Sequence, residues 1–158
     1  MHIVENGLTV DIYRELRLTG PFMNYKDEDV KIALENSLYS VVIYDEDIPV
    51  GIARLIGDNR ITFFLKDVVV HPNYRGKGIG KLLLKQIFHY IDRHACHNAY
   101  IGLNSTLGNE AFYERFGFIR RPNDEQGSGM SFYYQKQNRG EHHEKNRSIW
   151  KHQHRFSD

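Results

Sequence analysis

The chain has little of three things that would point to particular classes of protein: cysteine, excess charge and long apolar runs. Its only cysteine is Cys96, so no disulfide can form within the chain. Lys and Arg number 21 against 20 Asp and Glu, which excludes a global positive field that would recruit nucleic acid. No apolar run is long enough to span a membrane. We therefore expect neither nucleic acid nor membrane as a partner, and any anion must bind at a local site.

What is present favours one folded domain in the cytoplasm. Apolar residues make up 41% of the chain, including nine Phe and ten Tyr, which is more than a disordered chain contains. A length of 158 residues is enough to bury one core. The first residues lack the basic and apolar segments of a signal peptide, so we expect a cytoplasmic protein. The polar, aperiodic end of the chain predicts a domain over residues 1–137 and a His-rich extension over 138–158.

The spacing of apolar residues predicts an α/β fold of mixed type, in which two helices precede a run of strands and helices and strands then alternate. The long strand that ends in three valines should lie centrally in the sheet, because an unbroken apolar run suits burial on both faces. The predicted helices cover residues 8–18, 27–36, 79–92 and 108–116. The predicted strands cover residues 39–44, 50–56, 61–70, 100–103, 118–121 and 130–135.

A loop rich in glycine and cations lies between the long strand and the third predicted helix. Glycine lets the backbone approach a ligand closely, and the free N–H groups at a helix start point toward an anion. The order of the glycines differs from those of nucleotide triphosphatase and dinucleotide loops. The simpler alternative is a strand-to-helix turn whose cations are only solvated. The loop consists of Arg75, Gly76, Lys77, Gly78, Ile79, Gly80 and Lys81.

Two stretches resemble the Gcn5-related N-acetyltransferases. Residues 67–81 carry Arg-x-x-Gly-x-Gly after a valine-rich strand, which closely resembles the coenzyme A motif of that family. Residues 111–118, AFYERFGF, resemble the short helix and following strand of the same family. The resemblance covers about residues 9–136. It implies a GNAT fold, with a central, mostly antiparallel sheet, two splayed parallel strands that hold pantetheine, and flanking helices.

The resemblance also implies an acetyl-coenzyme A site without a metal. The glycine loop would hold the pyrophosphate, and the strand edge would bond the pantetheine arm and the thioester carbonyl. Many members carry an asparagine two turns before the catalytic tyrosine, where this chain has Thr106, and Asn109 lies one turn before it. Besides residues 75–81, the implied coenzyme contacts are Val68, Val69, Val70, Asn104, Asn109 and Phe112.

The chemistry of amine acetylation needs a base, an oxyanion donor and a proton for the leaving thiolate. An alkyl amine has a pKa of about 10, so about one molecule in a thousand is nucleophilic at neutral pH. For the base we consider Asp67, Glu110 or a water held by either, with Asp67 first. The alternative for Asp67 is a strand-end carboxylate that caps a turn or pairs with Lys66. The oxyanion donor would be the N–H of Val69 or Val70.

Tyr113 falls on the catalytic tyrosine of the family and would protonate the leaving thiolate. The alternative is a structural aromatic that packs beside Phe112 and Phe116. A covalent route through Cys96 has no activating neighbour, so we expect direct attack.

The acceptor is the least determined part of the reaction, because the same fold acetylates many amines. We expect a small primary amine, since Asp124 and Glu125 in the segment 121–130 would attract a cation and Phe22 and Tyr25 would cover an apolar body. The alternatives are a protein lysine or N-terminus, and a sensor that binds coenzyme A without catalysis.

The tail contains four histidines without a compact zinc spacing, so we expect no metal there. It would pack on its own domain or on a second copy, and the latter makes a homodimer one expected partner. The histidines are His142, His143, His152 and His154.

Overall fold

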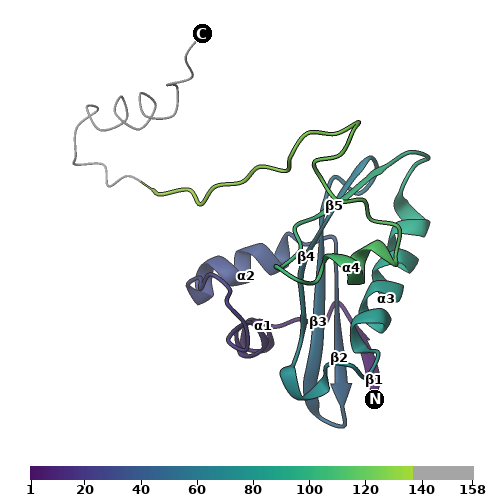
Figure 1. Cartoon of the computed structure of the whole chain (residues 1–158). Helices are drawn as coiled ribbons and strands as arrows, with labels where there is room; N and C mark the ends of the chain where they lie inside the picture. Colours follow the sequence, from purple (N-terminus) through teal and green to yellow (C-terminus); the bar gives the residue numbers. More distant parts are fainter. Residues whose placement is uncertain (137–158) are drawn as a thin grey trace, which may run out of the picture. The chain divides into compact units, whose positions relative to one another are not determined.

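The computed structural model describes residues 1–136. The chain divides into two units, residues 1–120 and a second that begins at Arg121. All helices and strands of the described residues lie in the first unit. The strands in Figure 1 are β1 (His2–Glu5), β2 (Tyr39–Asp45), β3 (Ile48–Gly57), β4 (Thr62–Val70) and β5 (Tyr100–Leu103). The helices are α1 (Val10–Arg17), α2 (Asp27–Glu35), the 3-10 turn η1 (Pro72–Tyr74), α3 (Ile79–His94) and α4 (Glu110–Glu114).

The five strands form one sheet in their order along the chain, β1-β2-β3-β4-β5. Neighbouring strands pair antiparallel except β4 and β5, which run parallel. A parallel pair needs a crossover connection, and α3 supplies it. Figure 1 places α1 and α2 on one side of the sheet and α3 and α4 on the other. This arrangement confirms the predicted mixed α/β fold with a mostly antiparallel sheet.

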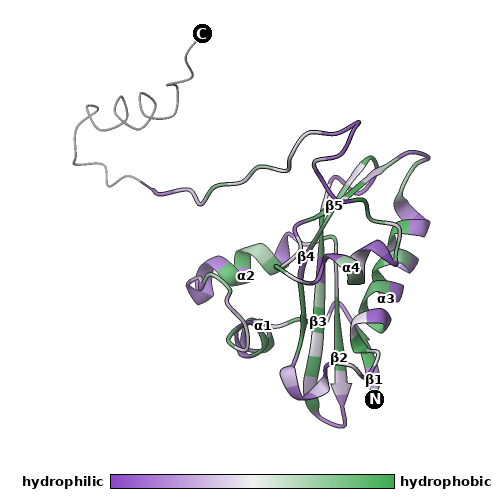
Figure 2. Ribbon diagram, in the orientation of Figure 1, coloured by the Kyte–Doolittle hydropathy of each residue, from purple (hydrophilic) through white to green (hydrophobic). Residues whose placement is uncertain are grey.

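The sheet separates two apolar cores. The larger core lies under α3, whose buried Leu83, Leu84 and Ile87 recur at helical spacing and pack against β2, β3 and β4. The smaller core lies under α1 and α2, where Leu16 and Val30 pack against Ile52. In Figure 2 the side of α3 that faces the sheet is coloured hydrophobic and its outer side hydrophilic. Among the described residues, no helix is long and apolar enough to cross a membrane.

Helix ends follow local sequence signals. Thr9 caps α1 by accepting a hydrogen bond from the N–H of Ile12 through its side chain. The acidic Asp27, Glu28 and Asp29 fill the first turn of α2, where negative charge suits the helix dipole. Both helices therefore begin within two residues of the predicted positions.

The sequence prediction is wrong at both ends of the sheet. Strand β1 was not predicted, because a strand of only four residues gives a weak signal. The expected strands at 118–121 and 130–135 are not strands in the described structure. Met130 is 94% exposed and Phe132 is 84% exposed. A strand forms only by pairing with a neighbour, and no described residues pair with these two segments.

Truncation of a buried side chain of α3 should destabilise the protein. We expect Leu83→Ala to lower the free energy of unfolding by about 2–5 kcal/mol, because Leu83 is fully buried and its loss leaves a cavity. Lys85→Ala, at an exposed position of the same helix, should change it by less than about 0.5 kcal/mol. Urea unfolding followed by circular dichroism measures both, and equal effects would contradict the assigned core.

Candidate functional site

The glycine loop leads into the N-terminus of α3 with its backbone open. Gly76 and Gly78 have φ of +74° and +83°, the left-handed region that glycine adopts without strain. A Cβ at either position would meet no other atom within 4 Å, so this stretch of backbone faces open space. Gly78 is the N-cap of the helix and makes no side-chain cap, so an anion could approach the first N–H groups.

Cations surround this helix start. Arg75, Lys77 and Lys81 are all exposed. The Lys77 Nζ atom lies 4.7 Å from the centre of the Tyr74 ring, which holds one ammonium group near the loop. Open backbone donors, a helix dipole and nearby cations together suit a phosphate ligand.

The helix start is fixed on the sheet by close packing. Ile79 is 2% exposed and lies over Gly51 of β3. A Cβ at Gly51 would lie 2.6 Å from Cγ2 of Ile79, so a side chain at position 51 would displace the helix. The sequence analysis missed this role of Gly51, although an isolated glycine inside a strand often marks such a close approach.

The two motifs identified in the sequence meet in space. A Cβ at Gly80 would lie 3.1 Å from Cζ of Phe112, which belongs to α4. The Phe112 ring in turn makes an edge contact with Tyr113, with ring centres 5.0 Å apart. The start of α3 and the short helix α4 are therefore neighbours, although 30 residues separate them in the chain.

Parallel strands β4 and β5 part before β4 ends. They pair from Thr62 with Tyr100 to Leu65 with Leu103, whereas β4 continues to Val70. Among residues 1–136, no strand pairs with the β5 side of β4 beyond Leu65. This stretch of β4 presents backbone groups beside the glycine loop, as the predicted splay requires.

Backbone alternation decides which valine points into the splay. The N–H of His71 donates to the carbonyl of Val50 in β3, with N and O 2.9 Å apart. Backbone groups along a strand alternate in direction, so the N–H of Val69 faces β3 and that of Val70 faces the open edge. The sequence analysis left Val69 and Val70 as equal candidates for the oxyanion donor, and the alternation favours Val70.

Asp67 produces an irregularity in β4 just before these valines. Lys66 and Val69 of β4 pair with two residues of β3 that have one residue between them. Asp67 and Val68, the two residues of β4 in the same interval, lie opposite that single residue. Asp67 has φ of +55°, a conformation that costs a non-glycine residue about 1–3 kcal/mol and that Asp tolerates better than most residues. The extra residue turns Val68 and Val70 toward the larger core and Val69 toward the smaller one.

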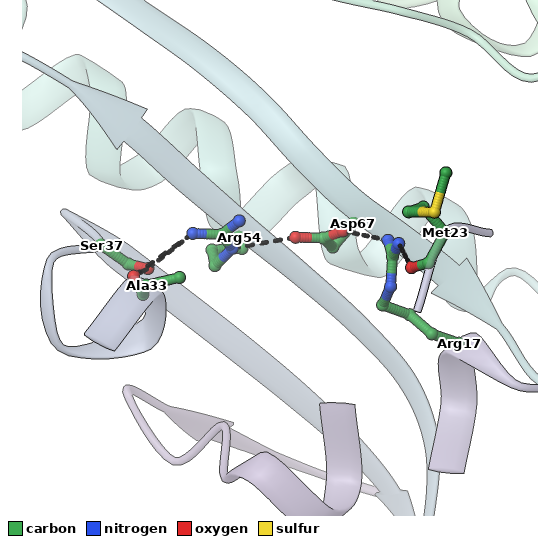
Figure 3. Close-up of polar contacts among 6 residues, drawn as sticks. All are labelled: Arg17, Met23, Ala33, Ser37, Arg54 and Asp67. Atoms are coloured by element: carbon green, nitrogen blue, oxygen red, sulfur yellow. Dashed lines mark hydrogen bonds and ion pairs between the residues drawn. The ribbon is translucent and has the colours of Figure 1, made fainter. Parts of the chain in front are cut away.

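The carboxylate of Asp67 is buried between two arginines, as Figure 3 shows. Its Oδ1 atom lies 2.5 Å from Nη1 of Arg17, and its Oδ2 atom lies 2.9 Å from Nε of Arg54. The side chain of Asp67 is 1% exposed. Both oxygens are therefore engaged by cations, and protonation of either would break an ion pair. This arrangement favours a structural role over proton transfer, and the partners are arginines where Lys66 was suggested.

Tyr113 is half-buried in α4, and burial raises its pKa to about 12. Its ring contacts those of Phe112 and Phe118 at centre distances of 5.0 and 6.0 Å. Asn104 and Asn109 are exposed, Nδ2 of Asn109 donates to Oγ1 of Thr106 over 2.6 Å, and Glu110 is half-buried in the first turn.

Comparison with known proteins gives the family. The model of the acetyltransferase (GNAT) domain matches residues 15–135, which is most of the chain. The chain belongs to the GNAT acetyltransferase family. The GNAT assignment agrees with the resemblance seen in the sequence, and it covers both motifs and the parallel strand pair.

Relatives and solved structures agree with this assignment. An uncharacterized N-acetyltransferase ycf52 of Gracilaria tenuistipitata is 30% identical over 102 residues, covering 62% of this chain and 55% of its own. Serotonin N-acetyltransferase 2, chloroplastic, of rice is 29% identical over 138 residues, covering 83% and 66%. The crystal structure of a probable acetyltransferase of Staphylococcus aureus matches with a TM-score of 0.77 and 28% identity, covering 84% and 98%. The chain spans little more than half the length of the curated ycf52 relative.

The sequence predicted the loop and the strand edge of this GNAT domain as coenzyme contacts, and it gave no role to Arg17 or Arg54. Arg54 stands within the apolar run 50–56 of a strand, where a charged residue signals a buried partner. Arg17 gives no comparable signal, because an arginine at a helix end is ordinarily exposed. The four tail histidines lie outside the described residues.

Alanine at Gly78 should weaken coenzyme A binding. A residue with a Cβ pays about 1–2 kcal/mol in the left-handed region, so the loop either shifts or strains and loses about tenfold in affinity. Lys85→Ala, further along the same helix, should keep the affinity within about twofold. Isothermal titration calorimetry with coenzyme A measures both. Equal affinity of Gly78→Ala and the parent would exclude the loop as the anion site.

Proposed function

We propose that this GNAT domain transfers the acetyl group of acetyl-coenzyme A to a primary amine of a small molecule by direct attack. The observation that carries the proposal is the unpaired edge of β4, which runs into an open glycine loop at the start of a long helix. An extended ligand with an anionic end fits such a surface, because a strand edge bonds amides and a helix start bonds phosphate.

The residues present fit acetyl-coenzyme A. The loop 75–81 would hold the pyrophosphate, and Val68 and Val70 would bond the pantetheine amides and the carbonyl. Asn104, Asn109 and Phe112 complete the proposed contacts. The coenzyme supplies an activated thioester carbonyl. The N–H of Val70 would then stabilise negative charge on the carbonyl oxygen, a contribution of roughly 3 kcal/mol for one well-placed donor.

Tyr113 is proposed as the donor to the leaving sulfur. A phenol with a pKa of about 12 keeps its proton at every pH at which amines react, so it can donate but cannot serve as a base near neutrality. A thiol has a pKa of about 8.5, well below that of Tyr113. We therefore expect Tyr113 to stabilise the thiolate by a hydrogen bond while the amine proton leaves to a base.

For that base, Glu110 or a water it holds replaces Asp67 as our first choice. Glu110 belongs to the same short helix as Tyr113 and remains half-exposed, whereas both oxygens of Asp67 are engaged. A half-exposed carboxylate can accept a proton through water and release it to solvent.

The acceptor is proposed to be a small amine with an apolar body. Between α1 and α2, Tyr25 is 51% exposed and Met23 is 47% exposed, so both can contact a ligand. Phe22 is less available than predicted, because the Arg17 guanidinium lies 4.8 Å from its ring centre. The name of the rice relative, a serotonin N-acetyltransferase, supports an arylalkylamine.

A homodimer and a cytoplasmic location complete the proposal. The rice relative is named chloroplastic, which describes that protein and sets the main alternative for this one.

Thiol release from acetyl-coenzyme A tests the reaction directly. The panel contains arylalkylamines, polyamines, aminoglycosides and lysine peptides, and thermal unfolding with coenzyme A runs alongside. We expect release with arylalkylamines. Release only with peptides would replace the small-molecule acceptor by a protein. Stabilisation by coenzyme A without release would leave a sensor, and no stabilisation would defeat the proposal.

Removal of the Tyr113 hydroxyl should separate catalysis from binding. We expect Tyr113→Phe to lower kcat by about 10- to 100-fold, the value of a hydrogen bond to a charged group, with coenzyme A affinity nearly unchanged. Calorimetry and steady-state thiol release measure the two effects. An unaltered kcat would remove Tyr113 from the chemistry.

The pH profile should carry no falling limb from Tyr113 between pH 7 and 10. The pKa of Tyr113 is raised to about 12, so its donating form is fully present below pH 10 and is lost only as the pH passes 12. The rate should rise with pH as the amine loses its proton. A falling limb below pH 10 that Tyr113→Phe abolishes would contradict the raised pKa.

A further inference from the structure

We propose that Asp67 is a positioning residue for acetyl transfer: through Arg17 and Arg54 it holds the β4 irregularity that turns the N–H of Val70 to the open edge. This inference rests on the proposed function. Asp67 itself would touch neither the coenzyme nor the amine.

Asp67 occupies a strained position in β4. It is the left-handed residue of the irregularity, three residues before Val70. Without the extra residue, the alternation of β4 would reverse and Val70 would face β3. The conformation that gives the open edge is thus unfavourable locally, and interactions elsewhere must maintain it.

Two arginines maintain this conformation of Asp67. Each oxygen of Asp67 bonds a guanidinium from a different element, Arg17 at the end of α1 and Arg54 in β3. The side chains of Arg17 and Arg54 are 10% and 9% exposed. Every buried side-chain nitrogen or oxygen of the described residues has a partner. Loss of the carboxylate charge would leave two buried cations without a counterion.

Both arginines also donate hydrogen bonds to residues other than Asp67, as Figure 3 shows. Arg17 donates from Nη2 to the main-chain oxygen of Met23 over 2.8 Å. Arg54 donates from Nη1 to Oγ of Ser37 over 3.2 Å and to the main-chain oxygen of Ala33 over 3.4 Å. The contacts therefore join the donor edge to the C-terminal end of α2 and, through Met23, to the exposed segment proposed for the acceptor.

Asp67→Asn is the sharpest test, because asparagine has the same shape and tolerates the left-handed region while it lacks the charge. We expect kcat to fall about 10- to 100-fold and the KM of the amine to rise, since small displacements at a reacting centre have effects of this size. The dissociation constant of coenzyme A should stay within about twofold, because the glycine loop is untouched. A purely structural role would lower thermal stability without this split.

Arg14→Gln is the matched control. Arg14 lies one turn before Arg17 on α1 and forms exposed ion pairs with Asp11 and Asp27. Exposed pairs contribute little, so kcat and KM should equal those of the parent. If Asp67→Asn does not fold, Arg17→Lys answers the same question. It keeps the charge beside Asp67 but loses the planar fork that bonds Asp67 and the main-chain oxygen of Met23 together, so the KM of the amine should rise at least about threefold.

Amide hydrogen exchange gives a readout that does not need turnover. Acetyl-coenzyme A should slow exchange of the Val70 amide in the parent and in Arg14→Gln, and much less in Asp67→Asn. Parental kcat, KM and Val70 protection in a folded Asp67→Asn would overturn the inference. If Asp67→Asn is unfolded, an amine KM in Arg17→Lys equal to that of the parent would overturn the inference. Absence of thiol release in the parent would instead defeat the proposed function.

Discussion

The open edge of β4 depends on one interaction, in which the carboxylate of Asp67 lies between the buried side chains of two arginines. Asp67 stands in a backbone conformation that a strand residue ordinarily avoids, and Arg17 and Arg54 come from different elements to meet it. Burial makes such a cluster sensitive to any single loss, since an unpaired charge in the interior is far costlier than an unpaired charge in water. The irregularity, the reversed alternation beyond it and the direction of Val70 then follow from one another.

The neighbouring features are arranged around that edge by simple packing. Gly51 lets Ile79 sit directly on the sheet, and Gly80 lets Phe112 approach the start of α3. Glycine thus serves two distinct purposes within a short distance: at positions 76 and 78 it permits left-handed backbone, and at positions 51 and 80 it leaves room for another element. Together these contacts bring the glycine loop, a strand edge and the tyrosine-bearing helix into one region.

Much of the fold and the site was predictable because the signals are local. The apolar period of α3, the strand-forming apolar runs of β2 and β3 and the glycine loop can be read directly from the residues, and the resemblance to GNAT proteins joins them. The Asp67 cluster was not predictable, because its three members lie 13 to 50 residues apart and only folding brings them together. The prediction of the last two strands failed for the opposite reason. Residues such as Phe132 have a high β propensity, but no strand of the described residues pairs with them.

The contact of Arg17 with Met23 runs to a main-chain oxygen and not to a side chain. The path of the segment between α1 and α2 is therefore fixed without fixing the residues that it displays. Tyr25 and the side chain of Met23 are exposed and can be exchanged while the anchor persists. A family that acetylates many amines could diversify its acceptors through such a segment, with the reacting edge left intact.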